Sequence, residues 1–196
     1  MINDLISDFD MKCFAFFGNM QSDFLTQAAK LFSLDNTFVL IICVCVLAGL
    51  CLIRRTRRIG FALLFAVLIG YLLTDGIIKP VVGRPRPFAA LQDNILFQEW
   101  YRNVGVQETS LFSFPSGHTT VFTAVTTVLL IFHAKSDRIA ARAAAWIFPV
   151  IAILFGCSRV YLMVHYATDV IASLIIGSAA GICGYCLAAV LKRRLC

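Results

Sequence analysis

Long apolar runs separated by short charged segments are the feature that most constrains how this chain can fold. A helix needs about 20 apolar residues to cross a membrane, because it rises about 1.5 Å per residue through a hydrocarbon core of roughly 30 Å. Runs of about this length cover residues 37–53, 59–78, 118–134, 143–164 and 168–191. The chain is also 60% hydrophobic, compared with roughly 45–50% in soluble domains. We therefore expect an all-α integral membrane protein, a helical bundle of about five transmembrane helices.

The first 35 residues have a different pattern, in which apolar and charged side chains alternate. Phe9, for example, lies between Asp8 and Asp10. Such a mixture suits amphipathic helices in the membrane interface better than a helix that spans the bilayer. We expect residues 1–35 to form an amphipathic interfacial segment and residues 36–196 to form the transmembrane domain. A sixth spanning helix within the first 35 residues is the alternative.

Basic residues gather in short clusters between the apolar runs. Three clusters contain ten of the 17 Lys and Arg residues: Arg54, Arg55, Arg57 and Arg58; Lys135, Arg138 and Arg142; and Lys192, Arg193 and Arg194. Because cytoplasmic loops are enriched in Lys and Arg, we place all three clusters in the cytoplasm. Segments 79–117 and 158–168 then meet on the extracytoplasmic side. The net charge of +6 does not form one continuous basic face, so we expect no nucleic-acid partner.

A first polar motif, Lys79-Pro-Val-Val-Gly-Arg84-Pro-Arg86-Pro87, follows the second apolar run on this outer side. Its prolines and glycine are expected to stop the helix and impose a stiff, extended turn. Three cations on a rigid segment can hold an anion, and arginine can bind phosphate through two parallel hydrogen bonds. The alternative is a set of basic anchors for lipid headgroups. Positive charge on the outer side runs against the usual bias, and a bound anion would explain it.

A second motif, Phe114-Pro115-Ser116-Gly117-His118, opens the third apolar run. Ser116 is expected to cap the N-terminus of this helix. The backbone N–H groups of Gly117 and His118 would then point outward at the positive end of the helix dipole, where anions bind. His118 could donate a proton at such a site, although a lone interfacial histidine is more often structural.

A third motif begins at Ser158 and contains Arg159, His165 and Asp169. The four-residue spacing of His165 and Asp169 places them on one face of a helical turn. A carboxylate that holds one imidazole nitrogen leaves the other nitrogen free to attack as a nucleophile. Histidine and aspartate also form structural pairs, so the spacing alone does not decide between the two roles.

Together the three motifs resemble the signature motifs of the type-2 phosphatidic acid phosphatase superfamily. The matching residues are Lys79, Arg86 and Pro87; Pro115, Ser116, Gly117 and His118; and Ser158, Arg159, His165 and Asp169. The resemblance covers roughly residues 35–190, and the short chain is similar to small bacterial members such as undecaprenyl-diphosphate phosphatases. It implies a bacterial multi-pass protein of the cell membrane, with a phosphatase active site on the extracytoplasmic face.

The resemblance also implies a mechanism without a metal or another cofactor. His165 would attack phosphorus to form a phosphohistidine, Asp169 would stabilise it, and His118 would protonate the leaving oxygen. The phosphate would be bound by residues of all three motifs, namely Lys79, Arg86, Ser116, Gly117 and Arg159. The substrate would be a lipid phosphate or diphosphate, such as a polyprenyl diphosphate, phosphatidylglycerol phosphate or phosphatidate.

A non-catalytic membrane transporter or anionic-lipid-binding protein is the main alternative. A transporter would more naturally carry ionisable groups near the middle of its spans, whereas here they lie at the outer ends. The superfamily also contains vanadium-dependent haloperoxidases, but the membrane architecture disfavours that activity. The sequence leaves the oligomeric state and the particular lipid open.

Three further charged residues on the outer side have no assigned role. Asp75 lies four residues before Lys79 and is expected to pair with it as a structural partner. Arg84 is expected to add to the positive field. Arg102, with its aromatic neighbours, could contact substrate or headgroups.

Overall fold

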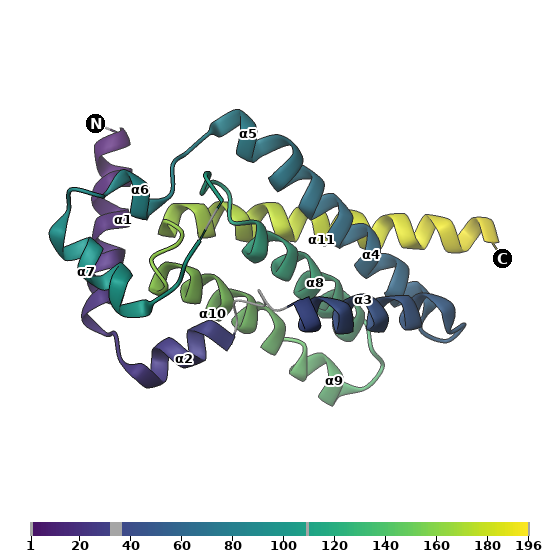
Figure 1. The fold of residues 1–196 in the computed structure, drawn as a ribbon. Helices are drawn as coiled ribbons and strands as arrows, with labels where there is room; N and C mark the ends of the chain where they lie inside the picture. Colours follow the sequence, from purple (N-terminus) through teal and green to yellow (C-terminus); the bar gives the residue numbers. More distant parts are fainter. Residues whose placement is uncertain (1, 32–36, 109, 196) are drawn as a thin grey trace.

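The computed structural model describes residues 2–31, 37–108 and 110–195, with side chains for residues 5–31, 45–108 and 110–191. Within these ranges the chain is almost entirely helical (Figure 1). The helices are α1 (Ile2–Asn19), α2 (Asp23–Leu31), α3 (Thr37–Leu52), α4 (Arg57–Tyr71), α5 (Lys79–Val82), α6 (Pro87–Ala90), α7 (Ile95–Val104), α8 (Gly117–Ala134), α9 (Ile139–Ala144), α10 (Ile147–Tyr161) and α11 (Ala167–Leu195). A π-helical segment, Leu72–Ile78, joins α4 to α5.

Four helical segments of the described chain are long and apolar enough to cross a membrane: Arg57–Val82, Gly117–Ala134, Ile139–Tyr161 and Ala167–Leu191. They correspond to the last four predicted spans. The first predicted span forms α3, whose 16 residues make a helix about 24 Å long. The expected all-α membrane bundle is therefore confirmed.

The long helix α11 is the centre of the bundle, and both α4 and α8 pack along it (Figure 1). Glycines make this close packing possible. A Cβ atom at Gly177 would lie 2.5 Å from the carbonyl oxygen of Thr120, and one at Gly181 would lie 2.7 Å from that of Ala124. Because both oxygens belong to α8, this face of α11 lies directly against the α8 backbone.

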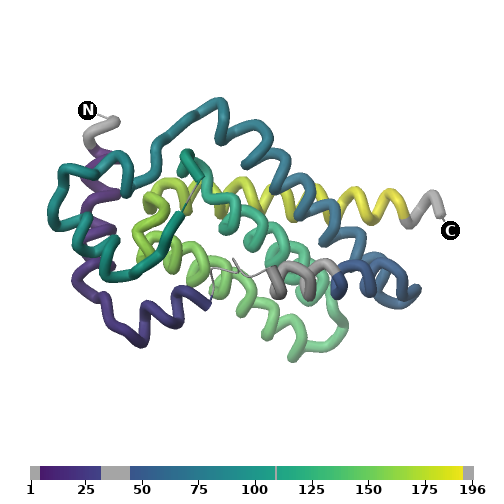
Figure 2. Tube along the Cα trace, viewed as in Figure 1, coloured from purple at the N-terminus to yellow at the C-terminus, as the bar shows by residue number. Residues whose placement is uncertain are grey.

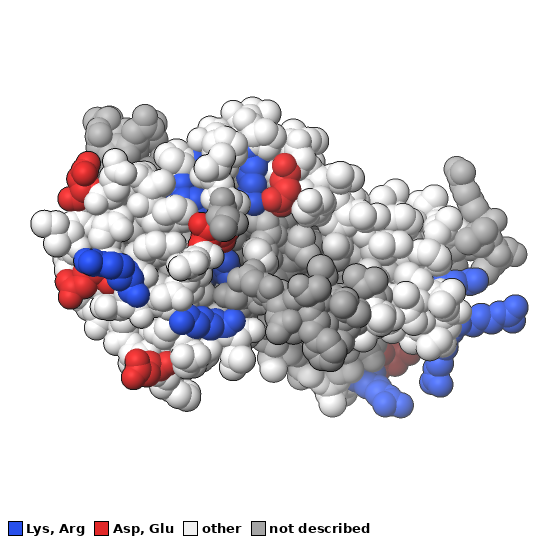
Figure 3. Space-filling view, viewed as in Figure 1, with Lys and Arg blue, Asp and Glu red and all other residues white. Residues whose placement is uncertain are grey.

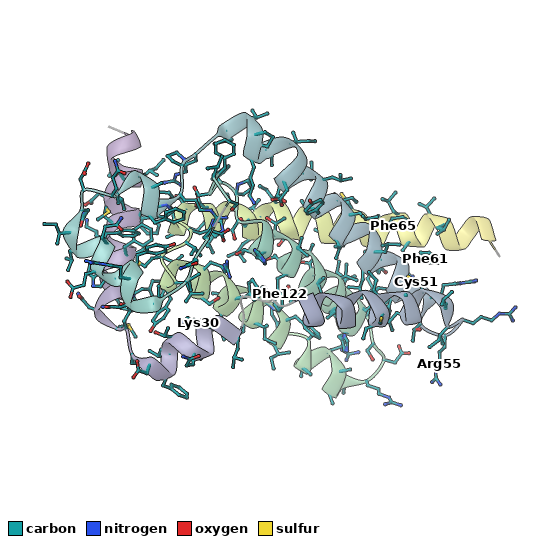
Figure 4. The ribbon with its side chains drawn as sticks, in the orientation of Figure 1. Lys30, Cys51, Arg55, Phe61, Phe65 and Phe122 are labelled. Atoms are coloured by element: carbon teal, nitrogen blue, oxygen red, sulfur yellow. The ribbon has the colours of Figure 1, made fainter. Side chains whose placement is uncertain are left out.

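One end of the bundle collects the basic clusters. The α3–α4 and α8–α9 turns lie together there (Figure 2), and Arg55 extends away from the helices at this end (Figure 4). Arg58 and Lys135 both donate to the hydroxyl of Tyr185 on α11, each at 3.0 Å. The first two basic clusters therefore share one end, while the side chains of the third cluster, residues 192–194, lie outside the described residues.

The opposite end of the bundle is covered by α1, α2, α6 and α7 (Figure 1). Helix α1 crosses this end, and its fully buried Phe14 packs against Phe97 of α7 and Tyr166, with ring centroids 4.9 and 5.7 Å apart. Helix α2 is attached by a hydrogen bond of 3.0 Å between the hydroxyls of Thr26 and Tyr161. On the face shown in Figure 3, Lys and Arg side chains gather toward the two ends of the molecule.

The outer surfaces of α1 and α2 expose large apolar side chains, among them Leu5, Phe9, Phe16, Phe24 and Leu31. This pattern is compatible with the predicted interfacial segment, whose location in a membrane stays a prediction. The proposed boundary between residues 35 and 36 lies within residues 32–36, which are outside the described residues.

The first motif differs from expectation in where its helix ends. The helix continues through Pro80 and ends at Gly83, which has a φ of 61°. Pro80 is the second residue of α5 and lies directly after the π-helical segment Leu72–Ile78. The extended segment therefore begins at Arg84, and it is fixed by a hydrogen bond of 2.8 Å from the Ser113 N–H to the Arg84 carbonyl.

We expect Gly181→Leu to destabilise the bundle, because the new side chain would collide with the α8 backbone. Overpacking of this kind costs about 1–3 kcal/mol, so the melting temperature in detergent should fall. Gly49→Leu is the matched control, since no described atom lies within 4 Å of a Cβ at that position. Equal losses in the two variants would contradict the packing described here.

Candidate active site

The three sequence motifs converge at the covered end of the bundle. Arg86 comes from the extended segment after α5, Arg159 from the last turn of α10, and His165 from the turn before α11. None of these side chains is more than 4% exposed. Buried charges are stable only when they are paired, so the cations of this cluster require carboxylates or a bound anion.

His165 lies between a guanidinium and a carboxylate. Arg86 Nη1 is 3.1 Å from His165 Nε2, and Asp169 Oδ2 is 3.5 Å from His165 Nδ1. Because arginine can only donate hydrogen bonds, Nε2 must carry the lone pair and Nδ1 the proton. The four-residue spacing thus brings His165 and Asp169 together, in the tautomer that leaves Nε2 able to act as a nucleophile.

The surroundings of His165 favour the neutral imidazole. Burial lowers its pKa well below the ordinary value of 6.5, and the charges of Arg86, Arg159 and Lys79 lower it further, while Glu108 acts in the opposite direction. A neutral imidazole keeps its lone pair at neutral pH. This is the protonation state that a histidine nucleophile requires.

A buried turn, residues 162–166, places His165. The predicted fourth span, 143–164, ends at Tyr161 because this turn begins there. Met163 has a φ of 60°, which is uncommon for a residue other than glycine. Its fully buried side chain packs in the apolar cluster that covers this end. The turn closes on α11, where Asp169 Oδ2 accepts the Tyr166 N–H at 3.0 Å.

Arg84 joins α1 to the start of α11. Its Nη1 donates to Asp169 Oδ1 at 2.7 Å and to the Thr168 hydroxyl at 2.8 Å, and its Nη2 donates to Asp10 Oδ2 at 2.8 Å. Asp10 is only 1% exposed and also accepts the Thr168 N–H at 2.9 Å. Two carboxylates therefore neutralise Arg84, which does not add to the positive field as expected from the sequence.

Lys79 and Asp75 form the expected pair, with 2.5 Å between Nζ and Oδ1. Asp75 belongs to the π-helical segment and also accepts a hydrogen bond of 3.0 Å from the Thr74 hydroxyl. A Cβ at Gly117 would lie 2.6 Å from Asp75 Oδ2 and 3.4 Å from Lys79 Nζ. The absence of a side chain at Gly117 therefore lets this pair lie against the start of α8.

The second motif forms the beginning of α8 as expected. Ser116 is the N-cap, and its hydroxyl accepts the Thr119 N–H at 3.4 Å. The Ser116 N–H donates to the Ser173 hydroxyl on α11 at 2.8 Å, which ties the two helices together. His118 lies in the first turn of α8 and is exposed. Phosphate binding by the Ser116 hydroxyl, which is itself fully buried, stays a prediction.

Two carboxylates of the site were missed by the sequence analysis, Asp10 and Glu108. Glu108 Oε2 lies 3.4 Å from Arg86 Nη2 and 4.0 Å from Arg159 Nη2. Burial alone would raise the pKa of Glu108, but Arg86, two hydrogen bonds from Ser110 and the charge of Arg159 bring it below its ordinary value. Glu108 is therefore ionised at neutral pH.

The sequence offered little signal for these two residues. Asp10 follows the same alternating pattern as Asp8, which is exposed and pairs with Lys12 at the surface. Glu108 is a single acid in a long loop rich in polar residues. Arg102 is exposed on α7, where its Nε donates to the Gln98 carbonyl of its own helix at 3.2 Å.

The sequence is similar to curated proteins whose names are those of phosphatases. Over 134 residues it is 31% identical to an undecaprenyl-diphosphatase of Sulfolobus acidocaldarius, a match that covers 68% of this chain and 57% of that protein. Over 147 residues it is 33% identical to phosphatidylglycerophosphatase B of Bacillus subtilis, covering 72% and 64%. The chain thus spans less than two thirds of the length of these relatives.

The fold is similar to that of a solved membrane protein. The crystal structure of a transmembrane PAP2-type phosphatidylglycerolphosphate phosphatase from Bacillus subtilis matches with a TM-score of 0.71 at 24% identity, over 98% of this chain and 88% of that chain. The family model of the PAP2 superfamily matches residues 59–193, a range that contains all three motifs. This chain is therefore a multi-pass membrane protein that belongs to the PAP2 superfamily.

Proposed function

We propose that this protein is a membrane lipid phosphatase that hydrolyses a lipid phosphate or diphosphate through a phosphohistidine intermediate. The observation that carries the proposal is the buried His165, with Nε2 facing Arg86 and Nδ1 facing Asp169. Strongly perturbed titratable groups of this kind cluster at functional sites. Membership of the PAP2 superfamily and similarity to two proteins named as phosphatases support the same reaction.

In the first step, Nε2 of His165 attacks phosphorus. The N–P bond forms while the bond from phosphorus to the lipid oxygen breaks. His118, as an imidazolium, transfers its proton to that oxygen, so that the lipid leaves as an alcohol or, from a diphosphate, as a monophosphate. The phosphorylated imidazole is positively charged, and Asp169 stabilises it through the carboxylate 3.5 Å from Nδ1.

In the second step, water hydrolyses the phosphohistidine. His118, now neutral, takes a proton from the water molecule whose oxygen attacks phosphorus. The N–P bond breaks, inorganic phosphate is released, and His165 returns to the neutral form. The exposed position of His118 is compatible with contact with water.

Positive charge from three elements would bind the phosphoryl oxygens. Lys79, Arg86 and Arg159 supply fixed cations, and the Gly117 N–H supplies a donor at the start of α8. Ser116 fixes that helix start through its cap. Arg86 is placed to exchange its contact with Nε2 for one with the phosphate, and its buried Nε has no hydrogen-bond partner among the described residues. Positioning and charge neutralisation provide most of the catalysis in phosphoryl transfer.

We place the active site on the extracytoplasmic face of a bacterial cell membrane. The site lies at the start of α11, at the end of the bundle opposite the α3–α4 and α8–α9 turns (Figure 1). These turns carry the first two basic clusters, and such clusters favour the cytoplasm. The substrate would then hold its phosphate at the outer boundary and its tail in the bilayer. A polyprenyl diphosphate and phosphatidylglycerol phosphate are supported by the two named relatives, and phosphatidate has the same chemistry.

We expect the purified protein in detergent with excess EDTA to release inorganic phosphate from at least one lipid of a panel. The panel contains undecaprenyl diphosphate, phosphatidylglycerol phosphate, phosphatidic acid and diacylglycerol pyrophosphate at equal surface concentration. His165→Gln should reduce release by several orders of magnitude, because it removes the nucleophile.

Wild-type release by the His165→Gln variant would eliminate this histidine as the nucleophile. Loss of activity in EDTA that a divalent cation restores would contradict a metal-independent reaction. No release from any lipid by folded protein would favour a non-catalytic transporter or an anionic-lipid-binding protein.

We expect the imidazole of His165 to stay neutral to well below pH 6.5, because burial and three nearby cations destabilise its charged form. Since the folded-state pKa is the lower one, His165 contributes stability above about pH 6.5, and this contribution is lost as the pH falls further. NMR titration of histidine-labelled protein measures the pKa, and the chain has only three histidines to assign. A His165 titration centred at or above 6.5 would contradict the electrostatics described here.

We expect Asp10→Asn to reduce kcat while KM changes little. Asp10 holds Arg84, which holds Asp169, so the variant should loosen the carboxylate that faces His165 Nδ1. A loss on the order of 10- to 100-fold is expected, because displacements of about 1 Å near reacting atoms have effects of that size. Asp8→Asn on the same helix is the control, since Asp8 is exposed. Unchanged kcat in Asp10→Asn would show that α1 does not position the site.

A further inference from the structure

Glu108 contacts two arginines that the proposed mechanism assigns to the phosphate. Its Oε2 is 3.4 Å from Arg86 Nη2 and 4.0 Å from Arg159 Nη2. Charge-assisted hydrogen bonds are usually about 2.7–2.9 Å long, and Arg84 makes two ion pairs of 2.7 and 2.8 Å nearby. The Glu108 contacts are therefore loose in comparison with the structural ion pairs of the same region.

The burial of Arg86 and Arg159 explains why the Glu108 carboxylate lies beside them. The side chains of Arg86 and Arg159 are 4% and 1% exposed, so their charges have little contact with solvent. A nearby anion offsets the cost of keeping two cations buried. Glu108 provides one negative charge, yet the Nε atom of Arg86 still has no hydrogen-bond partner among the described residues.

A phosphate group would satisfy the same arginines better than Glu108 does. A phosphate monoester carries about −1.5 to −2 charges at neutral pH and three strong acceptor oxygens. The Glu108 side chain is 18% exposed, whereas the arginines are almost fully buried, so Glu108 can withdraw toward solvent. Ser110 donates two hydrogen bonds to Glu108, and its hydroxyl also accepts one from Arg86 Nη2. Glu108 and Ser110 would therefore move away from Arg86 together.

We propose that Glu108 is an internal anion that competes with phosphate for Arg86 and Arg159 and leaves when a phosphate group binds. The inference rests on the proposed function, since it concerns the same binding site. Competition weakens the binding of every phosphate group, including the inorganic phosphate that the reaction releases. Glu108 therefore limits product inhibition and sets the affinity of the site.

The test measures binding of inorganic phosphate to the full chain in detergent by isothermal titration calorimetry. In Glu108→Gln the Kd for phosphate should fall by roughly 10-fold, a typical size for the coupling between two ligands. The KM for the lipid substrate should fall in the same direction. Glu99→Gln is the matched control, because it removes the same charge from an exposed position on α7 at the same end of the molecule.

An unchanged or higher Kd in Glu108→Gln would overturn the inference, as would an equal change in Glu99→Gln. A large loss of kcat without a lower phosphate Kd would instead make Glu108 a participant in the chemistry, which also overturns it. If Glu108→Gln does not fold, Glu108→Asp provides the second variant. Its shorter carboxylate should retreat from both arginines and lower the phosphate Kd by a smaller factor.

The wild-type protein separates this inference from the proposed function. If the wild type hydrolyses a lipid but the phosphate Kd of the variant is unchanged, the proposed competition is contradicted. The proposed phosphatase activity is then still supported. If the variant binds phosphate more tightly but the wild type hydrolyses no lipid, the proposed phosphatase activity is contradicted. The proposed competition between Glu108 and phosphate is then still supported.

Discussion

The ion-pair bridge from Asp10 through Arg84 to Asp169 is the interaction on which the site depends. It connects α1, the extended segment after α5 and the start of α11, three parts of the chain that are distant in sequence. Removing one partner of a buried ion pair typically costs about 3–5 kcal/mol, because the other charge is left uncompensated. The bridge also fixes the carboxylate that faces His165 Nδ1. The same bridge therefore holds α1 on the bundle and positions the carboxylate beside His165.

The partly and fully buried cations at this end differ in how tightly carboxylates neutralise them. Arg84 is bound by two carboxylates at 2.7 and 2.8 Å, and Lys79 by one at 2.5 Å. Arg86 and Arg159 share Glu108 at 3.4 and 4.0 Å. Because the contacts with Glu108 are the longest of these ion pairs, a bound phosphate would displace Glu108 more readily than the carboxylates that hold Arg84 or Lys79. The same low dielectric that makes the burial of Arg86 and Arg159 costly strengthens their attraction for a phosphate.

Apolar packing holds the charged residues of the site in place at the end of the bundle covered by α1 and α7. Phe14, Phe97 and Trp100 pack against the turn that precedes α11 and cover it. Within the bundle, the glycines of α11 let α8 approach closely, and the Ser116 N–H joins the same two helices by donating to the Ser173 hydroxyl. The start of α8 and the start of α11 are therefore held at a fixed separation, with His118 on one helix and Asp169 on the other.

The sequence alone determined the features that depend on neighbours within one or two turns. Apolar run length predicted the spanning helices, and residue type predicted the Ser116 cap. The four-residue spacings placed Asp75 beside Lys79 and Asp169 beside His165, because a helical turn brings such residues together whatever surrounds them.

Only the tertiary structure decided which charges meet across the fold. Asp10 reaches Arg84 from 74 positions away, and Glu108 reaches Arg86 and Arg159 from a loop whose conformation no local pattern predicts. Arg84 and Arg86 are separated by one residue, yet the first is neutralised by two carboxylates and the second faces His165. Residues two apart in an extended segment project to the same face, so the local backbone does not separate the two roles. The surrounding elements do: Asp10 of α1 and Asp169 of α11 contact Arg84, and the turn before α11 contacts Arg86.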